Sequence, residues 1–126
     1  MDFEEALRAE LGTIAGLTNK VFPLNATEGT KAPYIIYVSS EGVQDKSLLG
    51  YLSSKEVDCE INIVQASYGS MKSLTKLVIS QIISFIGRNI GENGPFIQNV
   101  TYHKPVELYE QEVNLYRCVI DCNFKF

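Results

Sequence analysis

A stretch near the middle of the chain alternates polar and apolar side chains without a break. Its polar members are Glu56, Asp58, Glu60 and Asn62, and its apolar members are Val57, Cys59, Ile61 and Ile63. A period of two is that of a β-strand, because successive side chains of a strand point to opposite faces. One apolar face and one polar face predict a sheet that buries a single side. Another element of the chain must therefore cover that side.

A long amphipathic helix is predicted downstream of this strand, from about Ser67 to Arg88. Its apolar side chains are Met71, Leu74, Leu77, Val78, Ile79, Ile82, Ile83, Phe85 and Ile86. Together they cover an arc of about 240°, whereas a helix packed on one sheet needs an arc of about 100° or somewhat more. We expect the excess to be covered either by the N-terminal helix or by another chain.

The remaining elements complete an α+β pattern. A short helix begins after Asp2, which caps it, carries a stripe of Phe3, Leu7 and Leu11, and ends near Gly12. The other segments are strands at 20–23, 34–38, 96–106 and 115–126, a long connection at about 42–54 and a turn at 108–114. This order predicts one domain over residues 1–126, with an antiparallel-rich sheet and one long and one short helix packed on one face.

Charge and hydropathy exclude several function classes. The 126 residues carry a net charge of -4, which argues against a protein held to nucleic acid by its own basic surface. No apolar run approaches the roughly 18 residues of a membrane span, so we expect no membrane contact. The acidic start of the chain is unlike a secretory signal, and we expect synthesis in the bacterial cytoplasm.

The sequence offers little chemistry. His103 is the single histidine, and no nucleophile pattern accompanies it. Cys59, Cys118 and Cys122 fall on apolar strand positions, where cysteine acts as a small hydrophobe, and Cys118 lies too far along its strand from Cys122 for a disulfide between them. We predict no catalytic residues, no metal site and no cofactor.

Three carboxylates, Glu56, Asp58 and Glu60, share the polar face of the alternating strand, with about 6.6 Å between neighbours. They form either a solvated face, partly offset by Arg117 and Lys125 on a neighbouring strand, or an acidic contact surface for a partner or a lumen.

The connection at 42–54 is unusually apolar, since it carries Leu48, Leu49, Tyr51 and Leu52 where polar residues are expected. Either this arm packs on the protein's own core, or it docks on another subunit.

Three motifs together resemble a known family. They are Lys20-Val21-Phe22-Pro23, Ala32-Pro33-Tyr34-Ile35-Ile36-Tyr37, and Leu108-Tyr109-Glu110-Gln111-Glu112 before Leu115-Tyr116-Arg117. With the Asp-Phe-Glu-Glu-Ala-Leu start and the long helix between them, they resemble the small tail completion (tail terminator) proteins of long-tailed bacteriophages and prophages. The resemblance covers essentially the whole chain, although Gln111 stands where the family usually has a proline.

The resemblance implies a structural role in the virion tail, without a reaction or a cofactor. Such proteins form a ring, typically a hexamer, on the head-proximal end of the tail tube, end tube polymerisation and join the tail to the head. The implied partners are further copies of the chain, the tail tube protein and the head connector protein, and DNA crosses the lumen without specific binding. The alternatives are a small prophage or bacterial enzyme that uses His103 or the acidic stripe, and a monomeric adaptor.

Overall fold

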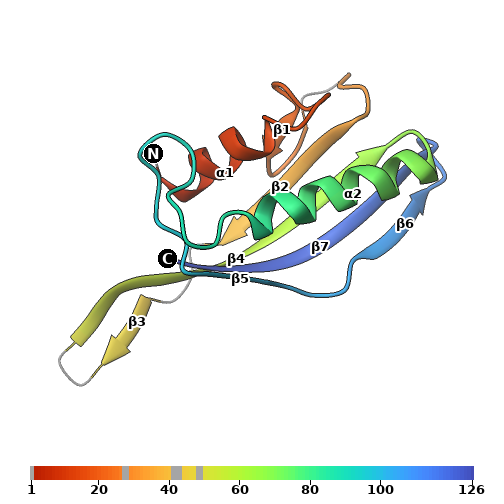
Figure 1. Ribbon diagram of the computed structural model, residues 1–126. Helices are drawn as coiled ribbons and strands as arrows, with labels where there is room; N and C mark the ends of the chain where they lie inside the picture. Colours follow the sequence, from red (N-terminus) through yellow and green to blue (C-terminus); the bar gives the residue numbers. More distant parts are fainter. Residues whose placement is uncertain (1, 27–28, 41–43, 48–49) are drawn as a thin grey trace.

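The computed structural model describes residues 2–26, 29–40, 44–47 and 50–126 (Figure 1). For residues 40, 44–47 and 50–54 it describes the backbone alone. The described residues form two helices, α1 (Phe3–Leu11) and α2 (Tyr68–Ile83). Their strands are β1 (Val21–Pro23), β2 (Tyr34–Ser40), β3 (Gln44–Ser47), β4 (Gly50–Gln65), β5 (Asn99–Tyr102), β6 (Val106–Glu110) and β7 (Leu115–Lys125). The predicted α+β class is confirmed.

One sheet joins these strands in the order β1-β2-β4-β7-β5, with β3 added to β4 and β6 added to β7. Neighbouring strands are antiparallel except β1 and β2, which run parallel. Both helices lie on the same face of the sheet, as predicted (Figure 1). The opposite face, here called the open face, is not covered by either helix.

The alternation in β4 decides which face is buried. Val57, Cys59, Ile61 and Ile63 lie under the helices with at most 2% of their surface exposed. The matching row on β7 consists of Cys118, Ile120, Cys122 and Phe124, which are also buried. Because β4 and β7 pair along ten residues of register, their two apolar rows form the centre of the core.

α2 is shorter than predicted. Ser67 caps its start, where the Ser67 hydroxyl accepts a hydrogen bond from the Ser70 amide at 3.2 Å. The helix ends at Ile83 instead of Arg88, since the amides of Phe85 and Ile86 bond to carbonyls three residues back and Gly87 adopts a positive φ of 82°. The apolar spacing persists through this turn, so the sequence pattern alone does not reveal where the helix ends.

The edge of the sheet also differs from the prediction. The sequence predicts a single strand at 96–106 and a turn at 108–114, whereas β5 and β6 are two short strands that pair with the same side of β7. They are separated at 103–105, where Pro105 lacks the amide that a continued ladder needs. The turn is confined to 111–114, with Asn114 at a positive φ.

The prediction of a long connection at 42–54 is wrong for the residues that the structure describes there. Residues 44–47 form β3, and residues from 50 onward belong to β4, which gives a β-hairpin. In the register of the pair, Gln44 lies opposite Lys55 and Ser47 opposite Gly50. This hairpin projects from one end of the molecule (Figure 1).

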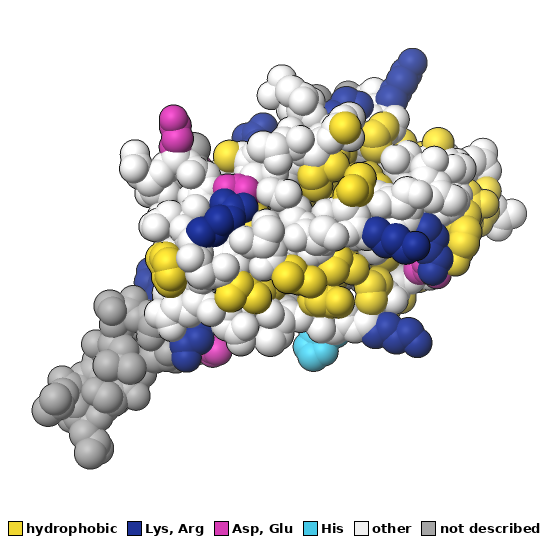
Figure 2. Space-filling model, viewed as in Figure 1, with side chains coloured by type: hydrophobic (Ala, Val, Ile, Leu, Met, Phe, Trp, Pro, Cys, Tyr) yellow, Lys and Arg dark blue, Asp and Glu magenta, His cyan; other side chains and the backbone are white. Residues whose placement is uncertain are grey.

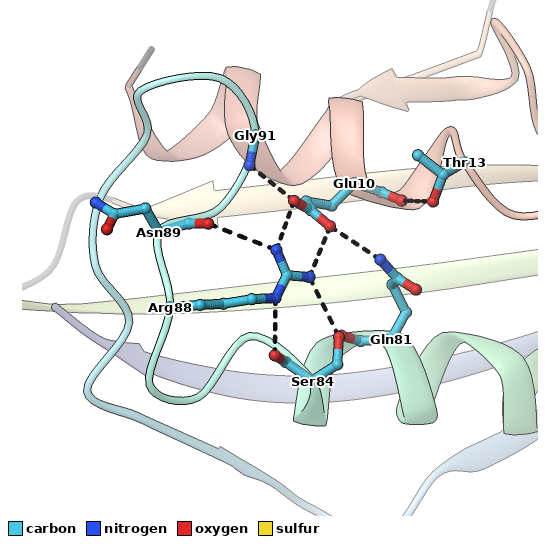
Figure 3. Close-up of polar contacts among 7 residues, drawn as sticks. All are labelled: Glu10, Thr13, Gln81, Ser84, Arg88, Asn89 and Gly91. Atoms are coloured by element: carbon cyan, nitrogen blue, oxygen red, sulfur yellow. Dashed lines mark hydrogen bonds and ion pairs between the residues drawn. The ribbon is translucent and has the colours of Figure 1, made fainter.

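A polar clasp joins α1 to the turn after α2 (Figure 3). Both carboxylate oxygens of Glu10 accept hydrogen bonds from Arg88, at 2.8 and 2.9 Å. Glu10 also accepts from the Gln81 amide group at 2.9 Å and from the Gly91 backbone amide at 2.8 Å. The clasp therefore ties α1 to the flank of α2 that carries Gln81.

Candidate functional site

The projecting hairpin contains the predicted subunit-contact arm. Leu48 and Leu49 lie outside the described residues, and Tyr51 and Leu52 lie near the start of β4, where the backbone is described. The main sheet, here called the body, ends where the Phe126 amide donates a hydrogen bond to the Lys55 carbonyl at 2.8 Å. Before Lys55, β4 pairs with β3 in the described residues. The docking role of the arm stays a prediction.

The predicted acidic residues Glu56, Asp58 and Glu60 all lie on the open face, and Asp121 joins them. Glu56 is opposite Lys125 in the register of β4 and β7, and Asp58 accepts a hydrogen bond from Asn123 at 2.9 Å. Asp121 lies directly opposite Glu60, so two carboxylates face each other across the strands. Sequence spacing does not reveal Asp121 as a member of this group, because only the strand register places it beside the stripe.

The sequence prediction assigns Arg117 to the charge balance of this stripe, and that prediction is wrong. It lies opposite Val64, near the other end of the open face, and forms an ion pair with Glu110 on β6. Arg117 also donates to the Asn62 side chain at 3.1 Å. Of the two predicted counter-charges, Lys125 lies beside the stripe and Arg117 does not.

His103 and the carboxylates meet at one shallow depression of about 450 Å³ on the open face. Asp58, Glu60 and Asp121 line it with His103, and all four residues are exposed. Acid–base catalysis works best where a pocket excludes water and sets the pKa of its groups apart. This depression is open to water, which favours a charged surface over a reaction centre.

The three cysteines are buried, as predicted, with free thiols. Cys59 and Cys122 are register partners on β4 and β7, a neighbour relation that sequence spacing does not reveal. Burial raises the pKa of the Cys122 thiol to about 12 and that of Cys59 above its usual range. Among the described residues, no three His, Cys, Asp or Glu side chains are grouped as a metal ion requires.

The flank of α2 that faces away from α1 carries exposed apolar side chains. Figure 2 shows them in a row along α2, between the helix and the β5–β6 edge. The exposed apolar residues of α2, its following turn and this edge include Tyr68, Ile83, Ile86, Tyr102 and Tyr109. The wide apolar arc predicted for the helix is thus left partly open to solvent.

This row ends in a hollow of about 310 Å³ between α2, β6 and β7, here called the tyrosine hollow. It is lined by Tyr68, Met71, Glu107, Leu108, Tyr109 and Tyr116. The Tyr109 and Tyr116 ring centroids are 4.8 Å apart, and those of Tyr68 and Tyr116 are 6.1 Å apart. No sequence pattern reveals this cluster, since its members come from three separate elements.

No helix within the described parts of the chain is both long and apolar enough to span a bilayer.

Comparison with known proteins gives a relationship of fold. No protein-family model and no curated protein sequence matches the chain. Among solved structures, the chain is similar to a chain of the "virion of native gene transfer agent (GTA) particle", with a TM-score of 0.57 and 14% sequence identity. The match covers 94% of this chain and 82% of that chain. The two proteins therefore share a fold along almost the whole of this chain.

Proposed function

We propose that this protein is a structural subunit of a phage-like virion. In this proposal it forms a ring, a hexamer, on the head-proximal end of the tail tube, ends tube polymerisation and joins the tail to the head connector. The observation that carries the proposal is the fold shared with a virion chain over 94% of the sequence. The tail role within the virion comes from the sequence resemblance to tail completion proteins.

The distribution of apolar surface supports assembly into a ring. A ring is built from head-to-tail contacts, so each subunit needs two different patches that complement each other. The hairpin, whose sequence is apolar at Leu48, Leu49, Tyr51 and Leu52, is the candidate for one patch, and the exposed row along α2 is the candidate for the other. Large exposed apolar surfaces on a folded protein are typical of contact sites.

The open face supports a lumen through which DNA moves. Glu56, Asp58, Glu60 and Asp121 place negative charge on one area of this face. Negative charge repels DNA phosphates and leaves a passing duplex unbound. We assign the open face to the inside of the ring on this ground.

Two experiments test the proposal together. Deleting the gene from its phage or prophage is expected to give tails of abnormal length that do not join heads. The purified protein added to isolated tail tubes is expected to bind at one end and to appear there as a ring by negative-stain microscopy. If deletion leaves tail length unaltered and the purified protein does not bind to tube ends, the protein has another function.

A further inference from the structure

The tyrosine hollow has the chemistry of a protein contact site. Tyr68 is 47% exposed and Tyr109 is 51% exposed, so two aromatic rings face solvent. Their hydroxyl groups are already used, since Tyr68 donates to Glu107 at 3.0 Å and Tyr109 donates to Asn114 at 2.9 Å. The free part of the hollow is therefore ring surface, and tyrosine is among the residues that contribute most to binding at interfaces.

The hollow lies beside an outer strand of the sheet. Within the described residues β6 pairs with β7 on one side, so its other edge presents backbone groups that can pair with an added strand. β6 has five residues, about 17 Å of extended backbone. A docking segment of similar length finds both an apolar hollow and a strand edge there.

The β3–β4 hairpin has matching properties. Between Gly50 and Lys55 its strand β4 extends about 17 Å beyond the body. Its sequence is apolar around Tyr51 and Leu52, and the neighbouring charges of Asp45 and Lys46 cancel. At the hollow, Lys72 and Glu107 form an ion pair at 2.9 Å, so the charges there cancel too. A hairpin of balanced charge can therefore meet this hollow without burying an unpaired ion.

A hairpin cannot reach the hollow of its own chain. β4 runs from the hairpin to Gln65, and Gln65 lies opposite Tyr116, which lines the hollow. The ten residue steps of strand from Lys55 to Gln65 span about 33 Å and hold the two surfaces at opposite ends of the sheet. Contact between them must join two copies.

We propose that the β3–β4 hairpin of one copy docks on the tyrosine hollow and the β6 edge of a second copy. This inference deepens the proposed function, on which it rests, by naming the two surfaces that meet in the ring. The contact is head-to-tail, so each copy gives its hairpin to one neighbour and receives a hairpin from the other.

Cysteine crosslinking between copies tests the contact directly. Tyr109→Cys is combined with Tyr51→Cys or with Leu52→Cys, because adjacent residues of a strand point to opposite faces. A short bismaleimide is added to the assembled protein, in which the buried native cysteines react slowly. The matched control combines the same hairpin cysteines with Phe96→Cys, since Phe96 is 50% exposed but lies near the other end of β7.

We expect at least one Tyr109→Cys combination to give a ladder of covalent oligomers on a denaturing gel. A mixture of the two single variants should give covalent dimers alone, because each molecule then carries one reactive surface. The Phe96→Cys control should give no ladder. Rings that form normally without Tyr109 crosslinks overturn the inference and leave the ring function standing. A chain that forms no oligomer, free or on tube ends, overturns the ring function and the inference with it.

Substitution provides a second readout that does not depend on crosslinking. Tyr109→Ala removes a half-exposed ring and is expected to raise the concentration for half-assembly at least tenfold, with little change in melting temperature. Phe96→Ala removes a ring of equal exposure and should leave assembly unchanged. Equal effects of the two substitutions contradict a contact at the hollow.

Discussion

Glu10 on α1 and Arg88 beyond α2 form a bidentate ion pair that fixes the two helices relative to each other. Both guanidinium Nη atoms donate to the carboxylate, and the Arg88 Nε atom donates to the Ser84 carbonyl at 2.9 Å (Figure 3). The Glu10 side chain is 13% exposed and the Arg88 side chain 40%. Because the pair is partly withdrawn from water and forked, it contributes more than an ordinary surface ion pair.

Breaking this pair is expected to destabilise the fold. Glu10→Gln should lower the free energy of unfolding at pH 7 by about 1 to 2 kcal/mol, since a partly buried Arg88 loses its charged partner. Arg88→Lys should have a similar effect, because lysine cannot donate in a fork. Urea denaturation measures both, with Glu112→Gln in the exposed turn as the control that should change little. Stability equal to that of the unmodified protein contradicts a role for the clasp.

The same carboxylate predicts a dependence on acid. The hydrogen bonds from Arg88 hold the pKa of Glu10 below its usual value of 4.5. A group whose pKa is lowered by folding stabilises the protein above its unfolded-state pKa, and this contribution is lost as the pH falls through the folded-state value. Stability measured between pH 6 and pH 3 should therefore decline less steeply in Glu10→Gln than in the unmodified protein. Parallel curves for the two proteins count against this assignment.

The cysteines predict a response to base and to thiol reagents. Cys59, Cys118 and Cys122 are at most 4% exposed, and burial raises the pKa of each thiol. The contribution of the buried thiols to the free energy of unfolding should therefore be fully present below pH about 9. It should fall at higher pH, because the thiols ionise first in the unfolded chain. All three should react with a disulfide reagent quickly in denaturant and slowly in the native state. A native intrachain disulfide, or zinc that survives dialysis, contradicts this account.

The facing carboxylates predict a stabilising substitution. Like charges directly opposite each other in a sheet are unfavourable, so Asp121→Asn should raise the free energy of unfolding by about 0.2 to 1 kcal/mol at low salt. The gain should shrink in 1 M salt, which screens the repulsion from Glu60. Glu112→Gln serves as the control, because it removes one negative charge away from the open face. A loss of stability in Asp121→Asn instead assigns Asp121 a structural role.

The arm predicts a separation of folding from assembly. Leu48→Ser combined with Leu49→Ser should leave the circular dichroism spectrum and the melting temperature nearly unchanged while weakening ring formation. Burial of a leucine against a partner contributes about 1.5 to 3 kcal/mol, so losing two can decide whether a ring holds. The expected virions have tails that are abnormally long or lack heads. A large fall in melting temperature with assembly intact would assign the arm to the protein's own core.

The sequence predicts the elements with strong periodicity and misses those that depend on register. The alternation from Glu56 to Ile63 gives the orientation of β4 correctly, and the apolar stripe from Met71 to Phe85 places α2 on its sheet. Strand pairing is a long-range property, so the opposition of Glu60 to Asp121 and of Cys59 to Cys122 follows from the fold alone.

Local patterns also fail where an element is short. β6 has four exposed residues and one half-buried residue, so no buried face imposes an alternation on it. The tyrosine hollow is not predicted from the sequence for the same reason. Tyr68 is far from Tyr109 and Tyr116 in the sequence, and the pairing of β6 with β7 places Tyr109 opposite Tyr116. The sequence predicts a loop in place of the hairpin for a related reason, since Ser53 and Ser54 interrupt any apolar period.

Ring formation is the central claim, and molar mass in solution tests it most directly. Light scattering should be measured over a wide range of concentration, and the assembled fraction imaged in negative stain, alone and with tail tubes. We predict 14.1 kDa monomers when the protein is dilute, and closed rings of six times that mass at high concentration or on tube ends. A protein that stays monomeric at every concentration and forms no ring on tube ends would contradict the account.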